Sequence, residues 1–157
     1  MQTFLPYMSF RETAKCLDYR RCGKQRVEAW QILNTLLNDG GWRNHPAVKQ
    51  WKGFEPLLCV YGIYMCREWI SRGYNDSLLP KFEEMRTNLG KVSIPWWLGD
   101  NRYHRSHQSN LLRKDPVHYG QFHWDIGPNL EYFWPSKEKE NKKCVVAVEQ
   151  VVELELI

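Results

Sequence analysis

The amino-acid sequence predicts a mainly α fold: a compact single-domain helical bundle with long loops. Helix start and stop signals recur along the first 120 residues, whereas the period-two patterns typical of strands are scarce. With 157 residues, 43% of them hydrophobic, the chain is long enough to bury a full core. Composition changes after residue 135, so we expect a domain over 1–135, then a charged linker and an apolar tail of unknown role over 136–157.

The first three helices are marked by their ends. Ser9 and Glu12 form a capping box, which predicts a helix over 10–18. A second helix is expected over 20–38, before the turn residues Asp39-Gly40-Gly41. Pro46 suits the first position of a short third helix.

The clearest helix lies in GFEPLLCVYGIYMCREWISRG, which is apolar nearly all round and therefore expected to be central and buried. Further helices are predicted over 80–88, over 102–113 and directly after Pro116. The aromatic segment 120–135 is expected to be an extended loop that closes over the surface. The apolar tail fits either a strand or a helix.

Charge is distributed unevenly along the chain. The net charge is +4, and residues 1–75 carry eleven Lys and Arg against six Asp and Glu. A second basic run, 101–114, has four Lys and Arg, two His and no acid. Two basic patches on one small domain are compatible with nucleic-acid binding.

No segment has the sequence of a signal peptide or approaches the roughly 20 apolar residues of a membrane span. The five cysteines are odd in number and include no C-x-x-C pair, so we expect buried reduced thiols and no zinc site. The sequence therefore predicts an intracellular protein without membrane contact: cytoplasmic in a bacterial or viral setting, nuclear in a eukaryote.

The stretch DYRRCGKQRVEAWQIL begins its helix with cations and places one acid among them. The cations are Arg20, Arg21, Lys24 and Arg26, and the acid is Glu28. In one interpretation Lys24 and Glu28 form a surface pair worth about 0.3–0.5 kcal/mol. In the other, the cations hold nucleic-acid phosphates while Glu28 acts on the sugar or base between them.

The histidines allow similar alternatives. His104 and His107 share one helix face with no acid or cysteine beside them, which favours phosphate contact over a metal site. His45, at a helix start, is either a local hydrogen-bonding residue or a site residue. The aromatic residues at 96–97 and 132–134 are expected to anchor the core and loops, with base stacking as the alternative.

Three motifs, in this order and spacing, resemble the pyrimidine-dimer DNA glycosylases of the phage endonuclease V type and their bacterial relatives. They are LDYRRCGKQRVEAWQIL, NHPAVKQW, and the long helix that ends in EWISRGYN. HRSHQSNLLRKDPVHY and YFWP also resemble the bacterial relatives, so the resemblance covers about residues 1–135.

The resemblance implies a compact helical domain and a bifunctional glycosylase and AP lyase that uses no metal or cofactor. In that family the α-amino group of the first residue attacks the sugar C1′, the base leaves, and a Schiff base precedes β-elimination. The matched carboxylate is Glu28, which assists the sugar chemistry. The implied partner is lesion-containing double-stranded DNA, and we expect the protein to act as a monomer.

The chain departs from the phage pattern at two positions. Gln2 is bulkier than the small residue that phage-type enzymes expose after methionine removal, so we expect Met1 to stay and its amine to be the nucleophile. Lys24 is the alternative nucleophile. An α-amino group in general titrates near about 7.7–8.0, which leaves a reactive fraction at neutral pH. Val27 stands where the phage type has an arginine before the matched glutamate.

The sequence therefore predicts a glycosylase that excises a damaged pyrimidine. The alternatives are a non-catalytic nucleic-acid-binding module, a glycosylase for another modified base, and a metal-dependent nuclease. The expected DNA contacts lie on both basic patches and are Arg20, Arg21, Arg26, His45, Arg102, Arg105, His107 and Lys114.

Overall fold

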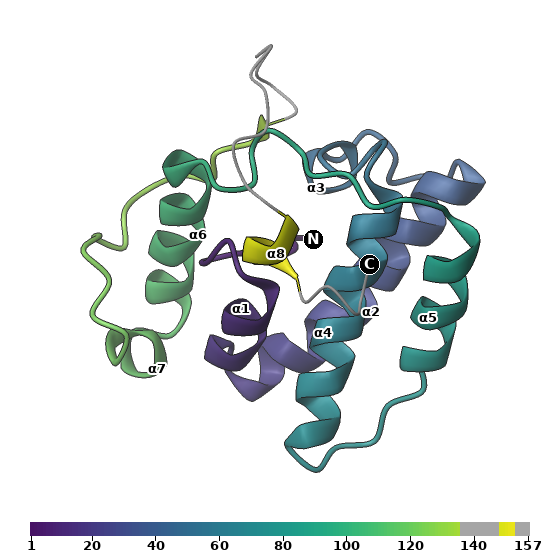
Figure 1. Ribbon diagram of the computed structural model, residues 1–157. Helices are drawn as coiled ribbons and strands as arrows, with labels where there is room; N and C mark the ends of the chain where they lie inside the picture. Colours follow the sequence, from purple (N-terminus) through teal and green to yellow (C-terminus); the bar gives the residue numbers. More distant parts are fainter. Residues whose placement is uncertain (136–147, 153–157) are drawn as a thin grey trace.

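The computed structural model describes residues 1–135 and 148–152, and these form helices and loops without a strand. The mainly α prediction is therefore confirmed (Figure 1). The helices are α1 (Phe10–Cys16), α2 (Tyr19–Asn38), α3 (Pro46–Lys49), α4 (Glu55–Ser71), α5 (Leu79–Asn88), α6 (Asn101–Lys114), α7 (Pro116–Gly120) and α8 (Val148–Val151). The linker that the sequence predicts after residue 135 lies outside the described residues.

Helix α4 is the central element, as its all-round apolar sequence predicts. Every residue from Leu57 to Cys66 is buried. Both α2 and α5 pack against it: α5 lies to one side of α4, and α2 crosses behind it in the view of Figure 1. The contact with α5 is close because Gly62 has no side chain: a Cβ there would lie 2.4 Å from the ring of Phe82. None of the described helices has the length and apolar character needed to cross a membrane.

The N-terminal segment, residues 2–6, enters the core as an extended chain with no strand beside it. Buried backbone groups need hydrogen-bond partners, and here side chains supply them. Gln25 of α2 accepts from the N–H of Phe4 at 2.8 Å, and Tyr61 of α4 donates to the carbonyl of Phe4 at 2.8 Å. The first residues of the chain are thereby fixed against α2 and α4.

Two histidines of α6 hold the next residue, Leu5. His107 accepts the N–H of Leu5 on Nδ1 at 2.9 Å, and His104 donates from Nδ1 to its carbonyl at 2.7 Å. His104 also accepts the N–H of Gly99 on Nε2 at 2.9 Å. Each ring must therefore be neutral, with opposite tautomers, because a second proton would face an N–H group.

His107 is fully buried, so the DNA contact expected of it is wrong. The two histidines do share one helix face, but that face points to the core. Sequence spacing fixes which residues lie together on a helix, whereas the buried N-terminal segment decides which side of α6 faces inward.

Residues 121–135 form a long loop, as the sequence predicts for 120–135, and this loop returns along α6 (Figure 1). Serine hydroxyls on α6 hold it: Ser109 donates to the carbonyl of Gly127 at 2.6 Å, and Ser106 accepts the N–H of Phe133 at 3.1 Å. This path brings Tyr132 to within 5.6 Å of His107, measured between ring centroids.

The neutral histidines predict that the protein loses stability in mild acid. Burial lowers the pKa of both His104 and His107 below the ordinary value of 6.5. Below that pH the unfolded chain binds more protons than the folded chain, so the unfolding free energy should fall as the pH falls. The slope should reach about 1.4 kcal/mol per pH unit for each histidine. Urea titrations at pH 7.5 and 5.0 measure it.

His123 offers a matched control because it is exposed and has a positive φ that asparagine tolerates. His123→Asn should leave the pH dependence unchanged, whereas His107→Asn should reduce the slope. An unfolding free energy that is equal at the two pH values would contradict the assigned tautomers.

Candidate active site

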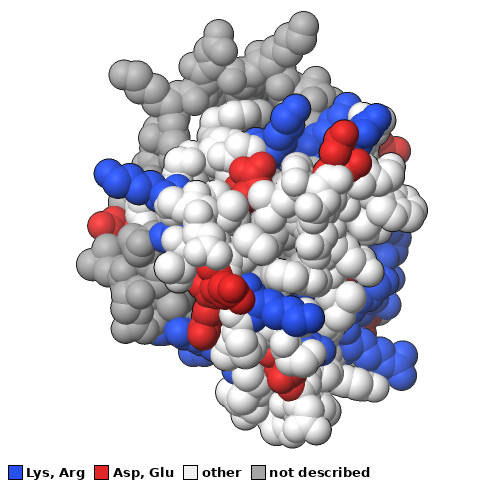
Figure 2. Space-filling model, turned by 90° about the vertical axis from the view of Figure 1, so that its right-hand side faces the viewer, with Lys and Arg blue, Asp and Glu red and all other residues white. Residues whose placement is uncertain are grey.

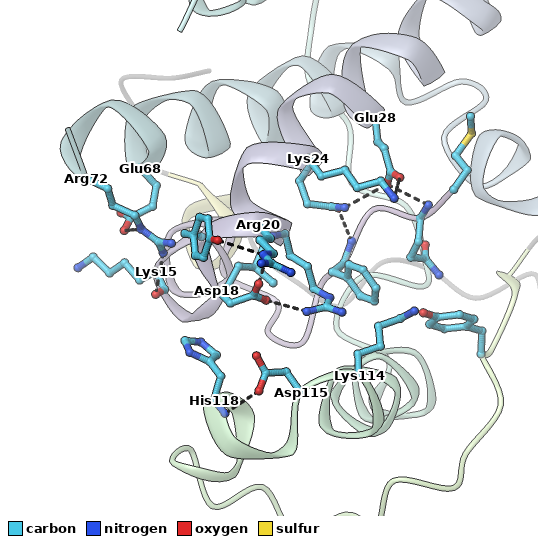
Figure 3. Close-up of a pocket in the computed structure, with 18 residues that line it drawn as sticks. Lys15, Asp18, Arg20, Lys24, Glu28, Glu68, Arg72, Lys114, Asp115 and His118 are labelled. Atoms are coloured by element: carbon cyan, nitrogen blue, oxygen red, sulfur yellow. Dashed lines mark hydrogen bonds and ion pairs between the residues drawn. The ribbon is translucent and has the colours of Figure 1, made fainter. Parts of the chain in front are cut away.

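A cleft of about 1000 Å³ opens between the N-terminal segment, α2 and the α6–α7 pair. Figure 3 shows Lys24 and Glu28 on one side of this cleft and Lys114, Asp115 and His118 on the other. Its lining holds six cations, Lys15, Arg20, Arg21, Lys24, Arg72 and Lys114, and four carboxylates, Asp18, Glu28, Glu68 and Asp115. The cleft therefore has a positive balance suited to an anionic ligand.

The amino end of α2 forms the cationic part of the cleft. Asp18 caps the helix, and its pKa is lowered because hydrogen bonds from Tyr119 and Arg21 outweigh the burial that would raise it. No acid occupies the first turn of α2, although the helix dipole there favours negative charge. Cations at the positive end of a helix favour binding of an external anion such as phosphate.

Glu28 lies at the inner end of this cationic stripe, with only 11% of its side chain exposed. Its Oε2 accepts the backbone N–H of Gln2 at 3.2 Å and the side-chain amide of Gln25 at 3.1 Å. Its Oε1 lies 3.5 Å from Nζ of Lys24. Glu28 thus lies between core and solvent, and its carboxylate is held in a fixed orientation.

Two residues that carry amines, Met1 and Lys24, line the cleft together with Glu28. The amine of Met1 belongs to the residue before the N–H that Glu28 accepts. The amine of Lys24 is on a side chain that is 71% exposed. The first is placed by the buried N-terminal segment, and the second can move freely on its long stem.

His45 is close enough to the N-terminal amine and to Glu28 for both charges to act on it. Burial lowers its pKa, and the positive charge of the N-terminal amine lowers it further, while Glu28 acts in the opposite direction. Its Nδ1 accepts the N–H of Ala47 at 3.0 Å, so it caps α3. His45 is thus both a local hydrogen-bonding residue and a neighbour of the candidate catalytic groups, which combines the two alternatives that the sequence left open.

Six of the expected site residues line this one cleft. They are Met1, Arg20, Arg21, Lys24, Glu28 and Lys114.

The other expected cations lie elsewhere. Arg26 turns away from the cleft, pairs with Asp76 and covers the ring of Trp69 at 4.7 Å. Arg102 pairs with Asp100 at 2.8 Å, and Arg105 donates to the carbonyl of Asp125 at 3.1 Å. Arg26 is thus a structural residue, and neither Arg102 nor Arg105 is among the residues that line the cleft.

Sequence reasoning missed the polar residues that connect the N-terminal segment to Glu28. Gln25 is almost fully buried and bridges Phe4 to Glu28. Gln2 is 5% exposed, and its Nε2 has no partner among the residues that the structure describes. A glutamine three positions before the carboxylate was the available signal, since residues i and i+3 share a helix face.

The face of the molecule seen in Figure 2 has a mixed surface, with Lys and Arg gathered toward one edge.

A family model described as pyrimidine dimer DNA glycosylase matches residues 1–80. These residues include α1 to α4 and the cleft wall that carries Lys24 and Glu28. Neither the curated proteins nor the solved structures contain a match.

Gln25 offers a direct test of how the site is held. Gln25→Leu leaves the buried N–H of Phe4 without an acceptor and removes a donor from Glu28. We expect the unfolding free energy to fall by about 1–3 kcal/mol, measured by urea titration. Gln31→Leu, on the exposed face of the same helix, is the control and should change it by less than about 0.5 kcal/mol. Equal effects of the two changes would refute the bridging role.

Proposed function

The chain belongs to the pyrimidine dimer DNA glycosylase family, whose model matches 1–80 of its 157 residues. On this basis we propose that it excises a damaged pyrimidine, one that belongs to a cyclobutane dimer, from double-stranded DNA. It then cleaves the strand as an AP lyase. The observation that supports this mechanism most directly is the hydrogen bond from the N–H of Gln2 to Glu28. It places the preceding residue, whose amine is the proposed nucleophile, beside the carboxylate.

The proposed reaction begins when the unprotonated Met1 amine attacks C1′ of the damaged nucleotide. The C1′–N1 bond breaks, its electron pair leaves with the base, and the base takes up a proton. The nitrogen loses a proton, the C1′–O4′ bond breaks, and O4′ takes up a proton, which gives the open-chain Schiff base. Loss of a 2′ proton then expels the 3′ phosphate, and water releases the amine.

Glu28 has two roles in this scheme. Its carboxylate stabilises the positive charge that develops on the sugar while the glycosidic bond breaks. It also accepts and returns protons during ring opening. Two fixed donors, from Gln2 and Gln25, keep one oxygen in place, and the other oxygen faces Lys24.

The cations of the cleft bind the DNA backbone in this proposal. Arg20, Arg21 and Lys24 come from α2, and Lys114 comes from the opposite wall. A nucleotide turned out of the duplex would lie between these walls, because chemistry at C1′ requires access that the base stack denies. Lys24 is the alternative nucleophile, since its Nζ lies 3.5 Å from Oε1 of Glu28.

Borohydride trapping tests the covalent mechanism. The protein is mixed with duplex DNA that contains either a cyclobutane thymine dimer or an abasic site, and borohydride should fix a covalent complex on a denaturing gel. Trapping with both substrates is expected. Trapping with the abasic site alone would point to another base lesion, and failure with both would leave a binding protein.

The two amines are separated by blocking one at a time. An N-terminal extension should abolish trapping, while Lys24→Gln should retain it with weaker DNA binding. The intact mass of each protein establishes which residue carries the α-amine. Full trapping by the extended protein, lost on Lys24→Gln, would assign the nucleophile to Lys24.

Glu28→Gln separates binding from chemistry. The amide keeps the size of the side chain but loses its charge, so DNA affinity should stay within about threefold while strand cleavage falls by roughly 100-fold or more. Gel-shift titrations and single-turnover cleavage measure the two effects. Unchanged cleavage would remove Glu28 from the mechanism.

A further inference from the structure

The junction between α1 and α2 is bonded to α7 through two neighbouring side chains. His118 donates from Nε2 to the carbonyl of Cys16 at 2.8 Å, and the hydroxyl of Tyr119 donates to the carboxylate of Asp18. Figure 3 shows Asp18 beside Arg20, with His118 near them. These bonds join the two walls of the cleft at the amino end of α2, where its cations gather.

Tyr119 is completely buried and holds Asp18 through both of its backbone-side and carboxylate groups. Its hydroxyl donates to Oδ1 of Asp18 and accepts the N–H of the same residue at 3.1 Å. Its ring stacks on that of Trp124, with 5.8 Å between the centroids and 18° between the planes. Burial and the neighbouring carboxylate both raise the pKa of Tyr119, so the hydroxyl keeps the proton that it donates. Asp18 is therefore oriented by a residue that is not among those lining the cleft.

Asp18 in turn holds Arg21 in the first turn of α2. Its Oδ1 accepts from Nη1 of Arg21 at 3.1 Å, and its Oδ2 accepts the backbone N–H of Arg21 at 3.4 Å. Within the described part of the chain, Asp18 is bonded to this guanidinium through Nη1 alone. The other nitrogens of the guanidinium are therefore left for an external anion.

The charge of Arg21 acts in the same part of the cleft as Glu28. Arg21 lines the cleft, and 24% of its side chain is exposed. Tyr132, which also lines the cleft, has its pKa raised to about 12 by burial; Arg113 and Arg21 oppose this rise, and Glu28 adds to it. Arg21 and Glu28 thus both lie near one ring, and an anion bound by Arg21 would lie near the carboxylate proposed to act on the sugar.

An arginine on a mobile stem loses conformational freedom when it binds a phosphate, whereas a guanidinium that is already fixed loses little. A carboxylate that was free to turn would pair with two nitrogens of the fork and compete with the phosphate. We propose that Tyr119 is a positioning residue for DNA binding: its hydroxyl fixes Asp18 so that Asp18 holds one nitrogen of Arg21 and leaves the others for a phosphate oxygen. This inference rests on the proposed function, because it takes a DNA phosphate as the ligand.

Tyr119→Phe removes the hydroxyl and keeps the buried ring. The probe is a duplex with a tetrahydrofuran analogue of an abasic site, which cannot form a Schiff base. The dissociation constant should rise about fivefold, and the slope of log Kobs against log salt should fall in magnitude by about 0.9, the share of one phosphate contact. Arg21→Gln should produce the same two changes. A purely structural role of Tyr119 would leave the salt slope unchanged.

A double variant shows whether Tyr119 acts through Arg21. In the Arg21→Gln background, Tyr119→Phe should change the dissociation constant by less than about twofold, since the group that it positions is gone. A general loss of structure would weaken binding in both backgrounds. Tyr7→Phe is the matched control, because the hydroxyl of Tyr7 accepts from Nε1 of Trp124 at 2.9 Å and Tyr7 is not among the residues that line the cleft. It should leave both affinity and salt slope unchanged.

The Nε–H signal of Arg21 in an NMR spectrum, assigned by its loss in Arg21→Gln, gives a second readout. In the wild-type protein it should shift when the duplex is added, and the absence of a shift would refute the phosphate contact on which the inference depends. Without DNA, its proton should exchange with water several-fold faster in Tyr119→Phe than in the wild type.

The outcomes separate this inference from the proposed function. Wild-type affinity and salt slope in Tyr119→Phe, or an equal loss of affinity in both Arg21 backgrounds, would refute positioning while the enzymatic function stands. If the wild-type protein binds the duplex but neither excises a dimer nor cleaves at an abasic site, the proposed function fails and the binding experiments still test Tyr119. Thermal unfolding establishes that each variant is folded at the temperature of the titrations.

Discussion

The arrangement of this protein depends on one extended segment buried without a strand partner. Residues 2–6 carry backbone N–H and C=O groups into the core, where each unpaired group would be costly. A sheet would satisfy them with another backbone. Here polar side chains from α2, α4 and α6 do so, and these are Gln25, Glu28, Tyr61, His104, His107 and Gln108. The helices are therefore tied together through the chain terminus as well as through apolar packing.

The same constraint places the candidate catalytic group. A chain terminus is normally among the least ordered parts of a domain, which is a poor location for a nucleophile. Anchoring of Gln2, Phe4 and Leu5 converts the terminus into a fixed point beside Glu28. A rigid approach of amine to sugar is what converts a bimolecular attack into an efficient step. The stability of the core and the geometry of the site thus have a common origin.

The sequence predicted local features well because their causes are local. Caps, proline positions and apolar runs predicted the ends of the helices to within about two residues. The row of cations that ends at Glu28 identified residues of one wall of the cleft. The sequence misjudged features that depend on distant partners. Arg26 meets Asp76, fifty residues away, and His107 meets Leu5, more than a hundred residues away. Neither partner could be inferred from spacing along one helix.

Several features of the site are unfavourable for the free protein. Arg20, Arg21 and Lys24 gather toward the positive end of α2, and the amide nitrogen of Gln2 is buried without a partner among the described residues. Elsewhere the core is conventional, with α4 buried and its neighbours packed on it. When departures from good local energetics lie around one cleft, binding of an anionic ligand is the simplest common cause, because its charge would offset that of the cations. The anchored N-terminal segment keeps these groups in place until the ligand arrives, so DNA would meet a site that is already assembled.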